Sequence, residues 1–186
     1  MFQRCWSEEG INDFSAGYCA PGPNAFVQCE SYNSHGYSGS TGMWATGLLF
    51  DCVTIDGHDL QIGNIGYDNY GSGWTTANST LWQCSAANIY ASDADSDACN
   101  VVYGCWADFH GTSFMAESNN HVQPWSLFAE QLSERLGHNA DNITHTYVRN
   151  TTQSTSPTIE EAQRYTAMAH LPRVTMAMWM DSVKFT

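Results

Sequence analysis

Leu81-Trp82-Gln83-Cys84 is one of five segments in which a cysteine follows an apolar residue by three positions. The five cysteines recur at irregular intervals, with Gly-, Asn-, Asp- and Ser-rich sequence between them. Local sequence that returns at intervals of about 20–50 residues is typical of stacked repeats, whose units bury their apolar sides against one another. The segments are Phe2-Gln3-Arg4-Cys5, Phe26-Val27-Gln28-Cys29, Leu49-Phe50-Asp51-Cys52, Leu81-Trp82-Gln83-Cys84 and Val102-Tyr103-Gly104-Cys105.

The residues around each cysteine favour short β-strands bounded by turns, because they lack helical periodicity. Three short strands and their turns would fill the usual interval between cysteines, and stacked strands lie about 4.8 Å apart. We therefore predict a mainly β fold, a right-handed parallel β-helix of about five coils over residues 1–122. In that register the five cysteines form one inward-facing ladder of small apolar groups, namely Cys5, Cys29, Cys52, Cys84 and Cys105.

The pattern changes after residue 122. Residues 123–137 predict a helix, with Pro124 in its first turn, an apolar stripe that includes Phe128 and Leu132, and Gly137 as its end. We expect this helix to cap the apolar end of the stack. Residues 138–186 predict a small α/β appendage: a polar linker, a second helix over residues 158–169 and an apolar terminal strand over residues 174–186.

The charge distribution excludes several classes of partner. Nineteen acidic residues face six basic ones, the formal net charge is −13, and no lysine or arginine occurs between Cys5 and Glu134. Nucleic acids and anionic membranes need basic patches, so neither is an expected partner. The same charge argues against unaided binding of polyuronates. No segment approaches the ~20 apolar residues of a membrane-spanning helix, so membrane insertion is not expected.

The composition favours an extracellular, secreted protein, because lysine is scarce and Ser, Thr, Asn and Trp are abundant. Three Asn-x-Ser/Thr sequons would accept glycans in that compartment. No signal peptide is recognisable after Met1, so we expect either that it has been removed or that the chain is part of a longer polypeptide. The acceptor residues are Asn78, Asn142 and Asn150.

Two of the seven cysteines, Cys19 and Cys99, lie outside the repeat. They are the better candidates for a disulfide between loops, although the sequence leaves the connectivity open. Since the count is odd, at least one thiol is left unpaired within the chain.

Several stretches resemble secreted right-handed parallel β-helix proteins of the pectate-lyase-like superfamily. The resemblance covers about residues 20–137 and corresponds to the C-terminal part of those longer chains. It implies a polysaccharide as ligand or substrate and lyase or hydrolase chemistry. The resembling stretches are Gly22–Cys29, Trp44–Asp51, Gly71–Asn78, Leu81–Cys84 and Val122–Gly137.

The sequence departs from that group where the chemistry would lie. Ser40-Thr41-Gly42-Met43 stands where members carry histidines and an arginine. Lyases of the superfamily abstract a proton with a Lys or Arg base beside Ca²⁺, and the interval without basic residues provides no such base. We therefore expect a module without catalytic activity.

One polar and aromatic cluster follows the third cysteine. Two carboxylates could serve as general acid and base on a glycosidic bond, and aromatic rings could stack on sugars. The alternative is that these Asp and Gly residues only build turns. The weak catalytic candidates are Asp56, His58, Asp59 and Asp68, and the carbohydrate-stacking candidates are Tyr67, Tyr70 and Trp74.

A second acidic cluster places Asp93, Asp95 and Asp97 at alternate positions, as in the first ligands of a calcium loop. Ala98 replaces the glycine that follows in an EF-hand, and Gly104 stands in place of its final glutamate. This segment predicts either an irregular Ca²⁺ site or a solvated acidic loop. No other cofactor is suggested.

Three functions follow from these patterns. The first is an extracellular, non-catalytic β-helix module associated with polysaccharide. The second is a structural subunit of an extracellular filament or surface layer, which self-assembles through the C-terminal strand. The third is an active acid/base glycoside hydrolase or a Ca²⁺-dependent polysaccharide lyase.

Overall fold

The computed structural model describes residues 1–67, 73–92, 98–137, 160, 163–164 and 167. The chain divides into two compact units, Met1–Ser156 and Pro157–Thr186. In the second unit the described residues are helical. They fall within the predicted second helix, whereas the predicted linker and terminal strand lie outside the described residues.

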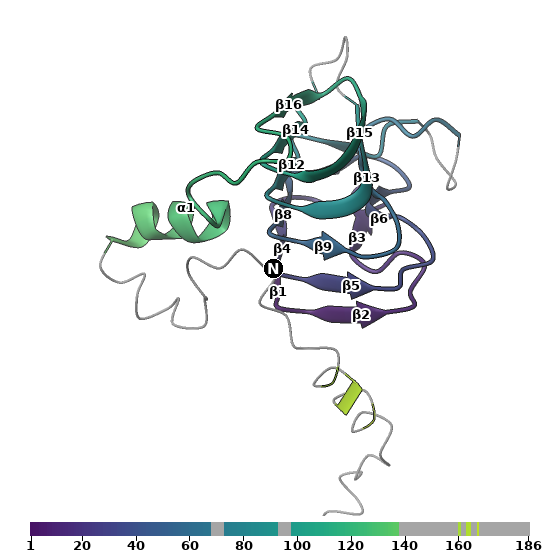
Figure 1. Ribbon diagram of the computed structural model, residues 1–186. Helices are drawn as coiled ribbons and strands as arrows, with labels where there is room; N and C mark the ends of the chain where they lie inside the picture. The colour runs from purple at the N-terminus through teal and green to yellow at the C-terminus, as the bar shows by residue number, and fades with distance from the viewer. Residues whose placement is uncertain (68–72, 93–97, 138–159, 161–162, 165–166, 168–186) are drawn as a thin grey trace, which may run out of the picture. The chain divides into compact units, whose positions relative to one another are not determined.

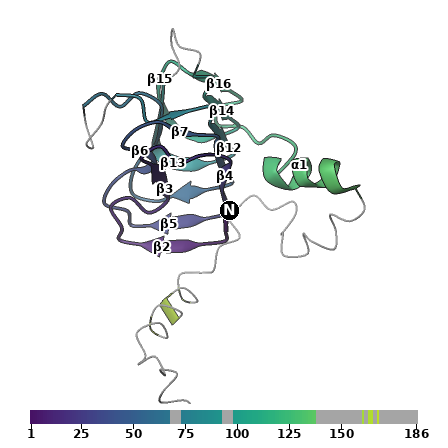
Figure 2. The ribbon, with the colours of Figure 1, turned by 180° about the vertical axis from the view of Figure 1, so that it is seen from behind.

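The first unit is mainly β, with parallel sheets and one C-terminal helix, and the sheets curl around a shared core (Figures 1 and 2). The first sheet contains, in order, β1 (Phe2–Gln3), β4 (Asn24–Val27), β8 (Leu48–Asp51), β12 (Thr80–Trp82), β14 (Val101–Tyr103) and β16 (Phe114–Ala116). The second contains β2 (Trp6–Glu8), β5 (Glu30–Tyr32), β9 (Thr54–Ile55), β13 (Ser85–Ala91), β10 (Leu60–Ile62), β6 (Ser38–Thr41) and β3 (Ser15–Gly17), with β15 (Trp106–Gly111) beside β13. A third pairs β7 (Ala45–Thr46) with β11 (Thr76–Ala77).

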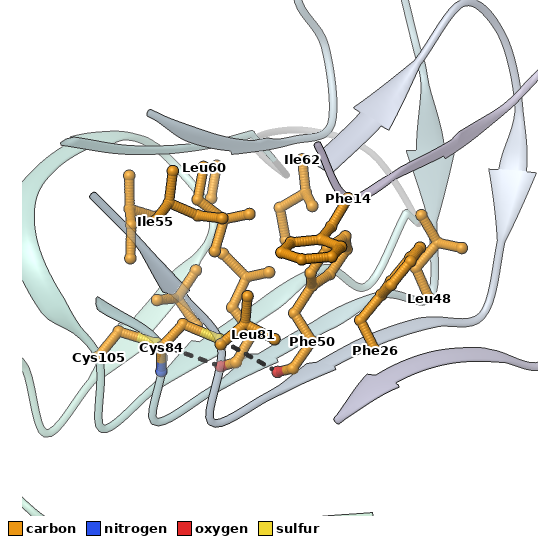
Figure 3. Packing of buried hydrophobic residues seen from close by; sticks show 14 of the residues in the cluster. Phe14, Phe26, Leu48, Phe50, Ile55, Leu60, Ile62, Leu81, Cys84 and Cys105 are labelled. Carbon is orange, nitrogen blue, oxygen red and sulfur yellow. Dashed lines mark hydrogen bonds between the residues drawn. The ribbon is translucent and has the colours of Figure 1, made fainter. Parts of the chain in front are cut away.

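The core is built from residues at equivalent positions of the stacked strands. Parallel pairing aligns Phe2 with Phe26 and Phe26 with Phe50, and the row continues through Leu81, Val102 and Met115. Because neighbouring strands lie about 4.8 Å apart, rings at one position stack face to face. The centroids of Phe26 and Phe50 are 4.9 Å apart, and Figure 3 shows both rings among the buried residues.

Each of the first five strands of the first sheet is followed by one residue of left-handed backbone. The N–H of each of these corner residues donates to a carbonyl of the next strand in the stack. The corner turns the chain into the second sheet, where the following strand pairs in parallel in the same way. The corner residues are Arg4, Gln28, Cys52, Gln83 and Gly104, with φ from 49° to 66°.

The predicted ladder of five cysteines is wrong at one position. Thr54 pairs with both Glu30 and Ser85, so the residue level with Cys29 and Cys84 is Val53. Cys52 lies one position earlier and is itself a corner residue. The sequence repeat misled because it aligns Leu49 with Phe26, whereas the structure pairs Phe26 with the following residue, Phe50.

The first sheet has six strands, one more than the predicted number of coils. The repeat did not reveal β16, which contains no cysteine and follows β14 more closely than the earlier strands follow one another. Its Met115 nonetheless continues the inner row, because Val102 pairs with Met115. Glu117, with φ 51°, follows β16 as the corner residues follow the earlier strands.

The predicted helix forms as α1 (Leu127–Leu136), with Ser126 as N-cap and Gly137 as C-cap. Pro124 precedes the N-cap instead of lying in the first turn. The helix is attached beside the first sheet: the Asp51 carboxylate of β8 accepts hydrogen bonds from the Ser126 hydroxyl at 2.6 Å and the Phe128 amide at 2.9 Å. These contacts contradict the prediction that the helix caps the end of the stack, because β8 is an inner strand of the sheet.

The chain that leads to α1 also lies along the corner row. Gln83 donates from Nε2 to the carbonyl of Trp125 at 2.7 Å, and Trp82 donates from Nε1 to the carbonyl of Pro124 at 3.1 Å. The Cys52 thiol donates to the Trp125 carbonyl at 3.2 Å. The returning segment thereby covers Asp51 and Cys52, which are both buried.

Replacing Asp51 by alanine should lower the free energy of unfolding by about 3 kcal/mol, because the buried Ser126 hydroxyl and the first amides of α1 lose their acceptor. Chemical denaturation measures the change. Asp56→Ala is the matched control: its side chain is exposed, so the change should stay within about 0.5 kcal/mol. Equal losses in the two variants would contradict this role of Asp51.

Asp51 should also shape the pH dependence of stability. Burial raises the pKa of Asp51, and hydrogen bonds from Ser126, Phe128 and Leu127 offset part of that rise. Since the folded pKa exceeds the unfolded one, the stabilising contribution is complete below the ordinary Asp pKa and is lost as pH rises through the folded pKa. The stability of the wild type relative to Asp51→Asn should therefore fall on going from acid to neutral pH. A gain in relative stability over that range would contradict a raised pKa of Asp51.

Candidate functional site

Polar and aromatic side chains gather on the outer side of the second sheet, where β10, β13 and β15 lie side by side. Successive residues of a strand alternate between its faces. Leu60 and Ile89 are buried and Phe109 packs on the core, so the residues flanking them point outward. We call this surface the Asn88 face; it comprises Asp59, Gln61, Asn88, Tyr90, Asp108 and His110.

Strand register places these residues in two rows. Asn88 pairs with Asp108, and Asp59 precedes β10 at the level of Asn88. In the second row, Gln61 pairs with Tyr90 and Tyr90 with His110. Equivalent groups thus recur at the spacing of adjacent strands, about 4.8 Å.

Asn88 connects the rows through its side-chain amide. Its Nδ2 donates to Asp59 Oδ1 at 2.8 Å, and its Oδ1 lies 3.4 Å from His110 Nε2. His110 Nε2 is also 3.6 Å from Asp108 Oδ2. Asn88 thus bonds to one carboxylate and contacts the imidazole, and the second carboxylate lies beside that imidazole on the outer face.

Tyr90 and His110 form an aromatic pair on the same face. Their ring centroids are 4.6 Å apart with an interplanar angle of 17°. Tyr90 is 39% exposed and the His110 side chain 41% exposed, so ring edges and polar tips reach solvent. The face therefore offers apolar ring surface directly beside hydrogen-bonding groups, a combination suited to a ligand that is itself amphipathic.

The structure brings only part of the predicted cluster together. Asp59 belongs to the Asn88 face, and His58 lies beside it, with Nδ1 3.5 Å from Asp59 Oδ2. Asp56 is exposed at the end of β9, and its peptide group bonds to Ser31 and Ser34. Asp68 lies outside the described residues.

The predicted stacking residues also separate. Tyr67 is 97% exposed. Trp74 stacks with Trp44 at 6.4 Å between ring centroids, and the two tryptophans meet because β7 pairs with β11. Tyr70 lies outside the described residues.

Sequence reasoning missed Asn88, Tyr90, Asp108 and His110 as members of the site. A shared pattern could have found them: Asn88-Ile89-Tyr90-Ala91 and Asp108-Phe109-His110-Gly111 both read polar, apolar, ring, small.

The predicted calcium ligands Asp93, Asp95 and Asp97 lie outside the described residues. Among the residues that the structure describes, no group of three His, Cys, Asp or Glu side chains is placed to hold a metal ion. Of the predicted glycan acceptors, Asn78 lies between β11 and β12 and is exposed, and Asn142 and Asn150 lie outside the described residues. Glycosylation stays a prediction.

All seven cysteines are free thiols in the structure. A disulfide formed by Cys19 or Cys99, whose connectivity the sequence leaves open, stays a prediction. Cys19 and Cys99 are exposed, whereas Cys29 and Cys84 are buried. Burial next to Cys5 raises the pKa of Cys29 to about 12, and burial next to Cys105 raises the pKa of Cys84. Because the thiolate is the reactive form, the buried thiols are inert in the folded protein.

One family model matches part of the chain. The model of a domain of unknown function, DUF6298, matches residues 113–186, about two fifths of the chain. The match includes β16 and α1. No curated protein and no solved structure matches. The comparisons do not show the pectate-lyase-like family, and that resemblance stays an expectation. Within the described residues, no helix has both the length and the apolar character needed to cross a membrane.

Thiol accessibility should divide the cysteines into two classes. In the folded protein without reductant, an aromatic disulfide reagent should modify Cys19 and Cys99 rapidly, and Cys29 and Cys84 only after unfolding, because the latter are buried with raised pKa values. Peptide mapping by mass spectrometry identifies the modified residues. If neither Cys19 nor Cys99 reacts until reductant is added, the expectation of two free, accessible thiols is contradicted.

Proposed function

We propose that this chain is an extracellular, right-handed parallel β-helix module that binds a neutral polysaccharide on the Asn88 face without cleaving it. The observation that carries the proposal is the pair of outward rows, Asp59–Asn88–Asp108 and Gln61–Tyr90–His110, across three adjacent strands. The alternative, in which the chain hydrolyses its glycan, predicts release of reducing ends.

The β-helix assignment is supported by the order of the strands. Strands of the first sheet pair in the order in which the chain forms them, β1 to β16. Corner residues such as Gln28 and Gln83 connect them each time to a strand of the second sheet. Crossover connections between parallel strands are right-handed in nearly all known cases, which gives the proposed hand.

The choice of polysaccharide follows from the chemistry of the Asn88 face. Sugars present hydroxyl groups that both donate and accept hydrogen bonds, together with apolar C–H faces. Asp59 and Asp108 supply acceptors, Asn88 supplies both a donor and an acceptor, and the Tyr90–His110 pair supplies ring surface. Repetition at strand spacing suits an extended polymer better than a compact small molecule.

Charge selects the kind of polysaccharide. The face carries two carboxylates, the chain has a formal net charge of −13, and residues 5–134 contain no Lys or Arg. A uronic acid polymer would meet like charge without a compensating base. Neutral glycans avoid this cost, and they are the proposed class.

The absence of cleavage is proposed from the contacts of the carboxylates. A general acid must hold its proton next to the glycosidic oxygen. The Asp59 carboxylate instead accepts a hydrogen bond from the Asn88 amide, and Asp108 lies beside His110. These contacts support a role in orienting hydroxyl groups of the ligand.

Tyr90→Ala should weaken binding of a neutral polysaccharide about tenfold, since it removes the ring that pairs with His110. Asn88→Ala should weaken it about fivefold by releasing Asp59 and His110. Affinity electrophoresis and calorimetry against neutral glycans, with a polyuronate as negative ligand, measure the change. Tyr18→Ala is the matched control, because Tyr18 is an exposed tyrosine outside the Asn88 face. Wild-type affinity in Tyr90→Ala and Asn88→Ala would refute this binding site.

Release of reducing ends from the bound glycan tests the alternative. The wild type should release none, with or without Ca²⁺. If a glycan is cleaved and Asp59→Asn abolishes the cleavage, the chain is a hydrolase and the non-catalytic part of the proposal is wrong.

A further inference from the structure

The outward residues of β15, which lies beside β13 in Figure 1, continue past the Asn88 face toward the start of the strand. Ala107 and Phe109 of this strand pack on the core. Because successive residues of a strand alternate between its faces, Trp106 points outward together with Asp108 and His110. Trp106 is 42% exposed. A further aromatic side chain therefore lies in line with the Asn88 face, on the same side of the second sheet.

A turn after β16 is fixed against the start of β15. The Trp106 N–H donates to the Cys84 carbonyl at 2.8 Å, on the side of β13. The backbone groups that point the opposite way are taken by Asn119. Its N–H donates to the Cys105 carbonyl at 2.8 Å, and its Oδ1 accepts from the Ala107 N–H at 3.2 Å. Both sides of the strand around Trp106 are thus held by hydrogen bonds.

His121 follows in this turn, and its other side is anchored as well. The next residue, Val122, donates from its N–H to Gln83 Oε1 at 3.3 Å, and its carbonyl accepts from Gln83 Nε2 at 3.1 Å. The Trp125 carbonyl accepts from the same Nε2 at 2.7 Å. The backbone on both sides of His121 is therefore bonded to the stack of strands, although His121 itself is exposed.

These anchors bring three rings together. The centroid of the His121 ring lies 5.2 Å from that of Trp106 and 5.7 Å from that of Trp125, with interplanar angles of 41° and 48°. Tilted ring pairs at such separations attract one another. We call Trp106, His121 and Trp125 the Trp106 cluster. Since its rings are positioned before a ligand arrives, stacking on them costs little side-chain entropy.

Two small residues of β13 flank Trp106. Register pairs Ser85 with Trp106, and an irregularity before Asn88 adds one residue on β13 in the stretch that contains the exposed Ala87. Neither Ser85 nor Ala87 has a side chain large enough to cover an indole ring. The ring surface of Trp106 is thereby accessible next to the Asn88 face.

The Trp106 cluster and the Tyr90–His110 pair lie toward the two ends of one row. A strand rises about 3.3 Å per residue, so the Cα atoms of Trp106 and His110 are about 13 Å apart. Asp108 lies between them and pairs with Asn88. The row therefore places ring surface at both ends and hydrogen-bonding groups in the middle. An extended linear glycan can follow such a line, whereas a coiled or branched glycan leaves it.

We propose that the Asn88 face and the Trp106 cluster form one binding site for a linear, extended neutral glycan that lies along β15. One sugar ring stacks at the Trp106 cluster and another at the Tyr90–His110 pair, and hydroxyl groups between them bond to Asn88. This inference rests on the proposed function and adds to it the direction, the shape and the minimum length of the ligand. His121 and Trp125 belong to residues 113–186, so the segment that matches the domain family completes the site.

The experiment measures the affinity of the full chain for oligosaccharides of increasing length by calorimetry. Cello-, manno- and xylo-oligosaccharides are the extended neutral probes, and malto-oligosaccharides are the coiled ones. A disaccharide is shorter than the distance between the two ring sites, whereas a hexasaccharide exceeds it. The wild type should bind the hexasaccharide of at least one extended series more tightly than its disaccharide and more tightly than maltohexaose.

Trp106→Ala should weaken binding of that hexasaccharide about tenfold and of the disaccharide no more than about twofold, because the disaccharide keeps the Tyr90–His110 pair. Trp106→Phe keeps a ring and should restore most of the affinity. Trp44→Ala is the matched control, since Trp44 is a half-exposed tryptophan outside the site, and it should bind all lengths like the wild type.

His121→Ala is a second variant that does not alter a strand of the sheets. It removes the ring that contacts both tryptophans, so it should weaken hexasaccharide binding about threefold and leave disaccharide binding unchanged. Circular dichroism and thermal melting verify that each variant is folded. A merely structural role of these rings would instead lower the affinity for every length by the same factor, and that result would overturn the proposal.

Failure of this inference is distinguishable from failure of the proposed function. If Tyr90→Ala weakens hexasaccharide binding while Trp106→Ala and His121→Ala bind like the wild type, the Asn88 face stands and its extension along β15 is wrong. The same conclusion follows if the wild type binds malto-oligosaccharides as tightly as every extended series. If the wild type binds no neutral glycan, both proposals are wrong.

Discussion

The fold depends on one backbone constraint, the left-handed residue through which the chain leaves the first sheet. Of the corner residues and Glu117, only Gly104 is a glycine, and a left-handed conformation costs other residues about 1 kcal/mol or more. Hydrogen bonds from each corner N–H to the next strand offset this cost. Once the corner is set, the residue after it faces inward, as Cys29, Val53 and Cys84 do, and the register of both sheets follows.

Asp51 shows how this frame holds the C-terminal helix. Its carboxylate lies on an inner strand of the first sheet and binds the N-cap and first amides of α1. A buried carboxylate is costly unless hydrogen-bonded donors surround it, so the contact fixes where the helix begins. The helix is thereby held beside the first sheet.

The Asn88 face illustrates what the sequence could and could not reveal about the candidate site. Asp59 and His58 were candidates from the sequence because they are close neighbours in it. Asn88 and His110 were not, because Asp59, Asn88 and His110 lie in three segments that are far apart along the chain. Parallel pairing brings these distant segments side by side. The pattern of outward residues was readable in each strand, but the pairing partners were not.

The sequence by itself determined the mainly β class, the stacking of repeated strands, a helix within residues 123–137 and the absence of Lys and Arg from residues 5–134. Composition and local periodicity encode these properties directly. The tertiary structure alone decided that Val53 replaces Cys52 in the inner row, that β16 adds a strand without a cysteine, and that Asp51 anchors the helix beside the sheet. The physical reason is that register is fixed by backbone hydrogen bonds between strands distant in the sequence, and a local motif can be displaced from that register by a single position.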